Sequence, residues 1–174
     1  MRIIKLWPQT NWELVWKNFL ATPVRISDLM TWYEVIHDII PKNIRLNRIR
    51  MSNTDACTEC GQKDILEHRL IECGEGRRMW NWAQSRIARI IRTSAANISS
   101  EWLTRPHFQL WPPYRHRAVL WMLALYVNFR LNNSRTLLPQ ELMDFMRRSK
   151  WKMYMLSNRH KFIANFLAVL DMPY

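Results

Sequence analysis

The chain has 174 residues, and its 26 Lys and Arg outnumber its 14 Asp and Glu to give a formal net charge of +12. Apolar residues make up 48% of the sequence, which is enough to build a core and excludes a disordered tail. The length fits one domain, or one domain with a small metal-held module, and the charge favours an anionic partner.

Two amphipathic helices are expected before residue 42. Thr10 and Glu13 have the spacing of a capping box, and apolar residues follow at helical spacing until Pro23: Trp12, Val15, Trp16 and Phe19. Ser27 is expected to cap a second helix that stops at Pro41 and has one apolar side, formed by Leu29, Trp32, Tyr33, Ile36 and Ile40. A short basic segment comes next and carries Arg45, Arg48 and Arg50.

All three cysteines fall between residues 57 and 73, in a C-x2-C-x7-H-x4-C pattern whose members are Cys57, Cys60, His68 and Cys73. Three thiolates and one imidazole complete a tetrahedral site and leave no position open for water, so one structural Zn²⁺ is expected. A redox C-x-x-C pair or ordinary buried thiols are the alternatives. A redox pair needs neither a spaced histidine nor a third cysteine, which favours zinc.

The only three glycines also lie in or beside this stretch. Gly61 is expected to let the backbone turn behind Cys60, because glycine tolerates positive φ. Asp64 is expected to cap a short helix that carries His68, with Glu67 as its capping-box partner. Gly74 is expected to end that helix just after Cys73, and Gly76 to precede the next one.

Helices are also expected through the rest of the chain. One runs after Gly76 to about Arg92 and turns Trp80, Ala83, Ile87 and Ile91 inward. Residues 95–113 form a looser stretch, and a buried helix follows from about Tyr114 to Leu131. Its apolar run at residues 118–127 is half the length of about 20 residues that a membrane span needs. Pro139 opens another helix, and a last one carries Phe162, Ile163, Phe166, Leu167 and Leu170.

The expected fold class is therefore all-α, a helical domain with an inserted Cys3His zinc knuckle. Residues 1–56 would form N-terminal helices, residues 57–76 the knuckle, and residues 77–174 a basic helical region of the same compact unit. Charge divides along the same lines, since residues 57–73 carry −2 and residues 74–174 carry +11. The partner surface is therefore expected downstream of the knuckle.

Basic side chains in that region form clusters on the predicted helices: Arg77, Arg78, Arg86, Arg89, Arg115, Arg117, Arg147, Arg148, Lys150 and Lys152, with Arg92 beside the second cluster. Each cluster alone is typical of a solvated helix face. Together they favour the backbone of RNA or DNA as partner, because arginine grips phosphate with two donors. Most tryptophans are expected in the core, and the ones expected to be exposed are Trp7, Trp111 and Trp151.

Catalytic residues are not expected. The sequence has no adjacent pair of aspartates, and its downstream carboxylates are too scattered for a metal-dependent nuclease. His37, His107, His116 and His160 lack companion nucleophiles or ligands. No signal peptide is apparent and the cysteines fit a metal site, so an intracellular protein of the nucleus or cytoplasm is expected, neither secreted nor in a membrane, with no small-molecule substrate.

The cysteine pattern and its flanks resemble a known family. The features that carry the resemblance are Trp32 to Pro41 upstream, Arg45-Leu46-x-Arg48, Cys57-x2-Cys60-Gly61, Glu67-His68-Arg69-Leu70, Cys73 and Trp80. They are similar to the zinc-binding region at the C-terminal end of reverse transcriptases of non-LTR (LINE-like) retrotransposons, the zf-RVT-like type. The seven-residue middle gap departs from Gag-type knuckles. The resemblance covers most of the chain and is strongest from about Trp12 to Trp82.

The resemblance implies a non-catalytic module that holds template RNA or target DNA beside the polymerase. Two alternatives stay open: a protein-interaction module that packs against a reverse-transcriptase core, and a truncated remnant without function. The sequence leaves open RNA or DNA, sequence specificity, the retrotransposon clade, the oligomeric state, and whether the chain is a native product or a fragment.

Overall fold

The structure is a computed structural model that describes residues 8–132 and 139–157, with the side chains of residue 45 and of residues 150–157 left out. Its α-helices are α2 (Trp12–Ala21), α3 (Ile26–Ile36), α4 (Asn43–Arg48), α5 (Gly74–Ile91), α6 (Pro113–Asn132) and α7 (Pro139–Ser157). Three short turns of helix accompany them: η1 (His68–Glu72, a π-helical turn), η2 (Ala95–Asn97) and η3 (Ser100–Leu103). An isolated bridge between Ala56 and Lys63 is the sole extended pairing in the described ranges, which confirms an all-α architecture.

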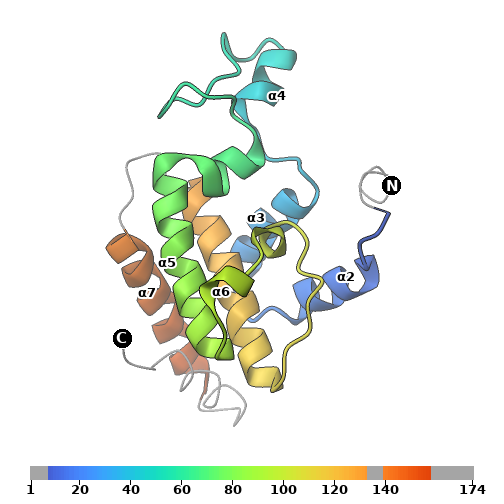
Figure 1. Cartoon of the computed structure of the whole chain (residues 1–174), viewed down its shortest axis with the longest axis vertical. Coiled ribbons are helices and arrows are strands. Elements are labelled where there is room, and N and C mark those ends of the chain that lie inside the picture. The colour runs from blue at the N-terminus through green and yellow to red at the C-terminus, as the bar shows by residue number, and fades with distance from the viewer. Residues whose placement is uncertain (1–7, 133–138, 158–174) are drawn as a thin grey trace.

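Helix α6 forms the centre of the fold. Every residue from Ala118 to Val127 is buried, so this helix is apolar on all sides and its neighbours surround it. Helices α3, α5 and α7 all pack against it (Figure 1). The predicted buried helix is confirmed. No helix in the described residues has the length and apolar character required to cross a membrane.

Two N-terminal helices form where they were predicted, but both predicted caps are wrong, and the second helix ends at Ile36 instead of continuing to Pro41. Asn11, not Thr10, caps α2, and its side-chain oxygen accepts a hydrogen bond of 3.0 Å from the Leu14 amide. Helix α3 begins at Ile26, so Ser27 lies inside its first turn, and no side chain caps it. The buried Asp28 is in that first turn, where its negative charge suits the helix dipole.

Further along the chain, α6 and α7 match the predicted ranges closely, and residues 95–112 form the predicted looser stretch. Trp111 is exposed as predicted, with 85% of its surface accessible. Trp7 and the predicted last helix around residues 162–170 lie outside the described residues, as does the side chain of Trp151. The division at residues 56 and 76 stays a prediction.

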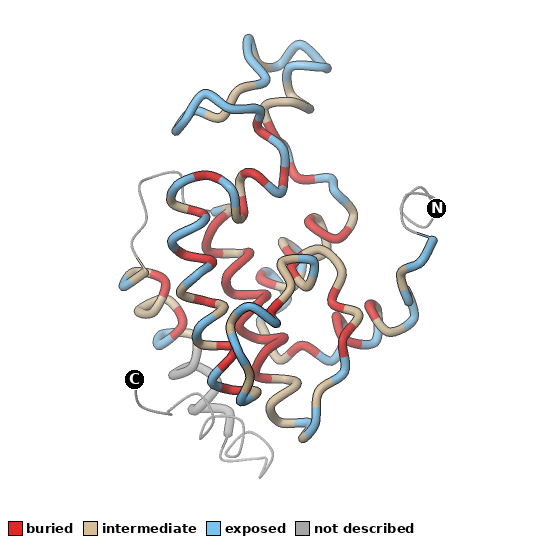
Figure 2. Tube along the Cα trace, viewed as in Figure 1, coloured by how far each residue is buried: buried red, intermediate tan, exposed pale blue. Residues whose placement is uncertain are grey.

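Helix α4 and the irregular segments next to it project from the helical body (Figure 1). Figure 2 shows that most of this projection is exposed, whereas the facing sides of α5 and α6 are buried. Helices α5 and α6 run antiparallel, so the end of α5 and the start of α6 lie together at the end of the body away from the projection (Figure 1).

Candidate metal centre

The four predicted ligands come together where the projection meets the helical body. The ligand atoms of Cys57, Cys60, His68 and Cys73 all lie within 4.8 Å of one another, so they could hold a metal ion. Cys60 Sγ lies 3.1 Å from His68 Nε2 and 4.0 Å from Cys73 Sγ. Two sulfurs bound tetrahedrally to one zinc would be about 3.8 Å apart, given Zn–S bonds of about 2.3 Å. The donor atoms therefore fit such an ion with little movement.

Cys57 and Cys60 lie on a tight loop. The Cys57 amide donates to the Gln62 carbonyl at 2.6 Å, and the Gly61 amide donates back to the Cys57 carbonyl at 2.9 Å. Gly61 has a φ of 75°, a conformation that costs glycine little. The predicted role of Gly61 is confirmed, because this turn brings Cys60 back toward Cys57.

His68 begins the π-helical turn η1, and Cys73 directly follows its last residue. The Cys73 amide donates to the His68 carbonyl at 2.8 Å, five residues back rather than four. In a regular α-helix, side chains five residues apart point about 140° away from each other. The wider turn brings the second side chain back over the first, as the H-x4-C spacing requires. Sequence reasoning found the short helix but not its widening.

Gly74 was predicted to end this helix, but it begins α5 instead. Cys73 separates the two, with an extended backbone (φ −57°, ψ 145°). The last carbonyls of a helix are often satisfied by a left-handed residue that follows it. Here α5 follows directly, and side chains from α6 supply donors instead.

Those donors are Tyr126 and Arg130, one turn apart on α6. The Tyr126 hydroxyl donates to the carbonyls of Leu70, at 2.5 Å, and of Gly76, at 3.3 Å. Arg130 Nη2 donates to the Arg69 carbonyl at 2.8 Å. Both side chains are buried, and burial raises the pKa of Tyr126, which stays a neutral donor. They tie the metal-site turn to the centre of the fold.

Sequence reasoning missed Tyr126 and Arg130, although a signal was present. They are polar side chains four residues apart at the end of a long apolar run, and such groups need partners when buried. Gly76 was expected only to precede the next helix, but it also contacts the metal-site turn. A Cβ on it would lie 2.9 Å from the Leu70 carbonyl oxygen, so only glycine lets α5 approach the turn this closely.

Asp64 does not cap the helix that carries His68, contrary to prediction. Its buried carboxylate accepts from the Asn43 amide at 2.7 Å and from Arg69, at 3.1 Å to Nε and 2.5 Å to Nη2. Asn43 is the first residue of α4, so Asp64 satisfies a free amide at the start of that helix instead. The carboxylate thereby joins the projection to the metal-site turn.

Carboxylates also flank the ligands. Glu72 Oε2 lies 3.8 Å from His68 Nδ1, on the side of the ring away from the thiols. The Cys73 thiol donates to Glu59 at 3.0 Å. Burial, followed by the nearby Glu59 carboxylate, raises the pKa of the Cys73 thiol to about 12. A metal ion would have to displace this proton, because the thiolate is the form that coordinates metals.

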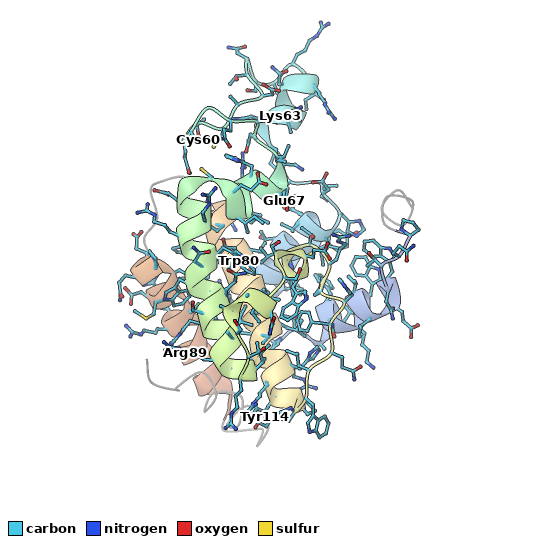
Figure 3. The ribbon with its side chains drawn as sticks, viewed as in Figure 1. Cys60, Lys63, Glu67, Trp80, Arg89 and Tyr114 are labelled. Atoms are coloured by element: carbon cyan, nitrogen blue, oxygen red, sulfur yellow. The ribbon has the colours of Figure 1, made fainter. Side chains whose placement is uncertain are left out.

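Eight of the ten predicted nucleic-acid contacts have described side chains, and these eight are not brought to one place. Arg77 and Arg78 lie within the first five residues of α5, near the metal centre, whereas Arg89 lies near the other end of that helix (Figure 3). All three are exposed, as are Arg147 and Arg148 on α7. The partly exposed ones are Arg86, which lies 5.9 Å from the Trp82 ring, and Arg115 and Arg117 at the start of α6. The side chains of Lys150 and Lys152 lie outside the described part of the structure.

Comparison with protein-family models, with curated proteins and with solved structures gave no match. The similarity to the zinc-binding region of retrotransposon reverse transcriptases therefore stays a prediction that depends on the cysteine pattern and its flanking residues.

Proposed function

We propose that the protein is a non-catalytic module that binds one structural zinc ion and binds nucleic acid, and that it belongs to, or derives from, a retrotransposon reverse transcriptase. The Cys3His cluster is the observation that carries this proposal, since its four donor atoms lie within 4.8 Å of one another. Thiolate and imidazole donors in tetrahedral arrangement suit zinc better than magnesium or calcium, which prefer oxygen.

Elemental analysis tests the zinc site. Protein purified under reducing conditions should contain about one zinc per chain, and its cobalt form should show the absorption of tetrahedral thiolate coordination. A Cys73→Ser variant should lose stoichiometric zinc while Ser85→Ala, on the exposed face of α5, should keep it. Full zinc content in Cys73→Ser would overturn the ligand assignment.

Charge supports the nucleic-acid part of the proposal. Residues 74–174 carry 16 Lys and Arg against five Asp and Glu, an excess of +11. Three of those five acids already face neighbouring arginines: Glu75 with Arg78 at 3.7 Å, Glu101 with Arg105 at 3.0 Å, and Asp144 with Arg147 at 3.3 Å. Excess arginine on helix surfaces suits phosphate contacts, which position a protein without reading bases.

The salt dependence of binding tests this part. If six to ten phosphates are bound, affinity should fall by about 10³–10⁵ between 50 and 200 mM salt. Changing Arg147, Arg148, Lys150 and Lys152 together to Gln should reduce the salt slope by about 0.9 for each duplex phosphate that is no longer bound. A control with the same loss of charge, at exposed positions outside the basic region, changes Lys17, Arg48, Arg50 and Lys63. Equal effects of the two sets would argue against phosphate binding by α7.

A protein-interaction module is the second candidate. Leu20, Ile26 and Met30 are exposed around the junction of α2 and α3, at 76%, 78% and 50%. Exposed apolar side chains of this kind would suit packing against a polymerase core. If the protein shows no salt-sensitive binding to RNA or DNA, this candidate replaces the nucleic-acid proposal.

The retrotransposon origin has its own test, which needs no protein. The genomic reading frame upstream of the Met1 codon should encode a polymerase in frame with this chain. An unrelated or closed frame there would count against the origin without affecting the zinc site.

A further inference from the structure

Among the tryptophans whose side chains are described, Trp111 is the one that does not pack into or against the core. Trp32, Trp80 and Trp121 are buried, and Trp12, Trp16, Trp82 and Trp102 pack against the core. Trp111 exposes 85% of its surface instead. It directly precedes Pro112 and Pro113, whose rings fix φ and stiffen the backbone that presents the indole. A large apolar ring held in water is a typical contact residue.

The surroundings of Trp111 are strongly basic. Pro113 begins α6, whose first residues include Arg115 and Arg117 and no acidic side chain. The end of α5 lies at the same end of the body, and it carries Arg89 and, just beyond, Arg92 (Figures 1 and 3). Arg89 and Arg92 are both exposed, and neither has an ion pair with the described residues.

Few acidic residues accompany these arginines along the sequence. From residue 86 to residue 130 the sequence contains one acidic residue, Glu101, against seven arginines. Glu101 lies 3.0 Å from Arg105, so its charge is already engaged. The positive end of the α6 dipole adds a further partial positive charge beside Arg115.

We propose that Trp111, Arg89, Arg92, Arg115 and Arg117 form a surface that binds single-stranded nucleic acid. A base stacks on the Trp111 ring, and the arginines bind the phosphates on either side of it. A duplex hides the faces of its bases, whereas a single strand offers them, so an exposed indole among arginines selects the single strand. The inference rests on the proposed nucleic-acid function and locates it at the end of the body away from the metal centre.

A Trp111→Ala substitution in the zinc-loaded full chain tests the surface. Fluorescence anisotropy at 50 mM salt would compare labelled oligo-U and oligo-dT, each of about 12 nucleotides to match the site size of single-strand binders, with a DNA hairpin of mixed sequence. Removal of one stacked base should weaken single-strand binding by about 5- to 150-fold, and duplex binding by less than about twofold, since phosphate contacts carry no base readout. Trp111→Phe should retain much of the affinity, because a phenyl ring still stacks. Leu20→Ala, which truncates another exposed apolar side chain, is the control and should change neither.

The salt slope separates stacking from charge. Trp111→Ala should leave the slope unchanged, whereas the pair Arg115→Gln and Arg117→Gln should lower it by about 0.7 for each single-strand phosphate that is no longer bound. Poly-glutamate at equal charge should compete poorly with the single strands, because it has no bases to stack. The RNA and the DNA oligomer both present stackable bases, and the ratio of their affinities identifies the preferred strand.

Two outcomes would overturn the surface while sparing nucleic-acid binding itself. One is unchanged single-strand affinity in Trp111→Ala, and the other is an equal loss of affinity for single strand and duplex. Efficient competition by poly-glutamate would show that charge alone is recognised and would also overturn the stacking role. Absence of salt-sensitive binding to every oligomer would refute the proposed function and this surface together.

Discussion

Tyr126 offers the sharpest test of how the metal site is held. Tyr126→Phe removes one hydroxyl from a side chain that is 0% exposed, and it leaves the ring in place. The Leu70 carbonyl then loses its 2.5 Å hydrogen bond, and water cannot readily reach it. A buried polar group left without a partner costs about 1–3 kcal/mol. Because Leu70 lies between His68 and Cys73, we expect part of this cost to appear as weaker metal binding.

Two measurements separate the effect on folding stability from the effect on metal binding. Urea unfolding of the zinc-loaded protein should show a free energy of unfolding lower by about 1–3 kcal/mol. Competition with a chelating dye should show zinc affinity lower by up to about tenfold for each 1.4 kcal/mol that falls on the turn. Tyr33→Phe is the matched control. The Tyr33 hydroxyl has no hydrogen-bond partner among the described residues, so its removal should change stability by less than about 0.5 kcal/mol.

This role of Tyr126 is excluded if Tyr126→Phe matches the wild type in both measurements. It is excluded in part if stability falls while zinc affinity is unchanged, since the hydroxyl would then support α6 and α5 without positioning the ligands.

Gly76, His116 and the metal ion each provide a further test. Gly76→Ala should lower the free energy of unfolding by about 1–3 kcal/mol in urea and weaken zinc binding, because the new Cβ would lie 2.9 Å from a backbone oxygen. Gly74→Ala is the control and should do neither, because the space around its Cβ is open. Burial lowers the pKa of His116 from its usual 6.5, and the nearby charges of Arg117 and Lys17 lower it further. The unfolded chain therefore binds the proton more readily than the folded one, so stability should fall as pH drops through 6.5. In the metal-free, reduced protein the urea midpoint should therefore drop between about pH 7.5 and 5.5, on either side of the usual histidine pKa, and it should drop less in His116→Gln; an identical drop would exclude His116. Chelation should loosen the segment around residues 55–75 and leave most far-UV helix signal, since the body has its own core; disappearance of all helix signal would mean that the metal holds the whole fold.

Sequence periodicity predicted the body of the fold well, because burial controls it. Helix α6 is apolar on every side, which leaves it no position other than the centre. The ligand pattern was equally informative, since C-x2-C and H-x4-C specify chemistry regardless of the path of the backbone between them. Both features depend on residue type and spacing alone.

Local hydrogen bonds were harder to predict because nearby polar side chains compete for them. Asn11 and Thr10 can each cap a helix, and only the backbone angle of the entering chain decides between them. Asp64 has a capping-box partner in sequence, yet it forms a charge-assisted pair with Arg69 and caps a helix 21 residues upstream. No pairwise sequence rule contains such a long-range alternative.

The π-helical turn limits how this protein can vary. Its extra residue places the side chains of His68 and Cys73 on the same side of the turn. Three residues after Cys73 a glycine is required, because the backbone at Gly76 lies against the Leu70 carbonyl of that turn. Deleting one residue between His68 and Cys73 would restore a regular helix and rotate the cysteine by about 100°. The loop just after Cys60 is held by the Cys57–Gln62 turn and the Ala56–Lys63 bridge, but its residues face solvent, so it has room to lengthen. In related sequences, insertions should therefore gather in the gap before the histidine, while the spacing from histidine to cysteine to glycine keeps its length.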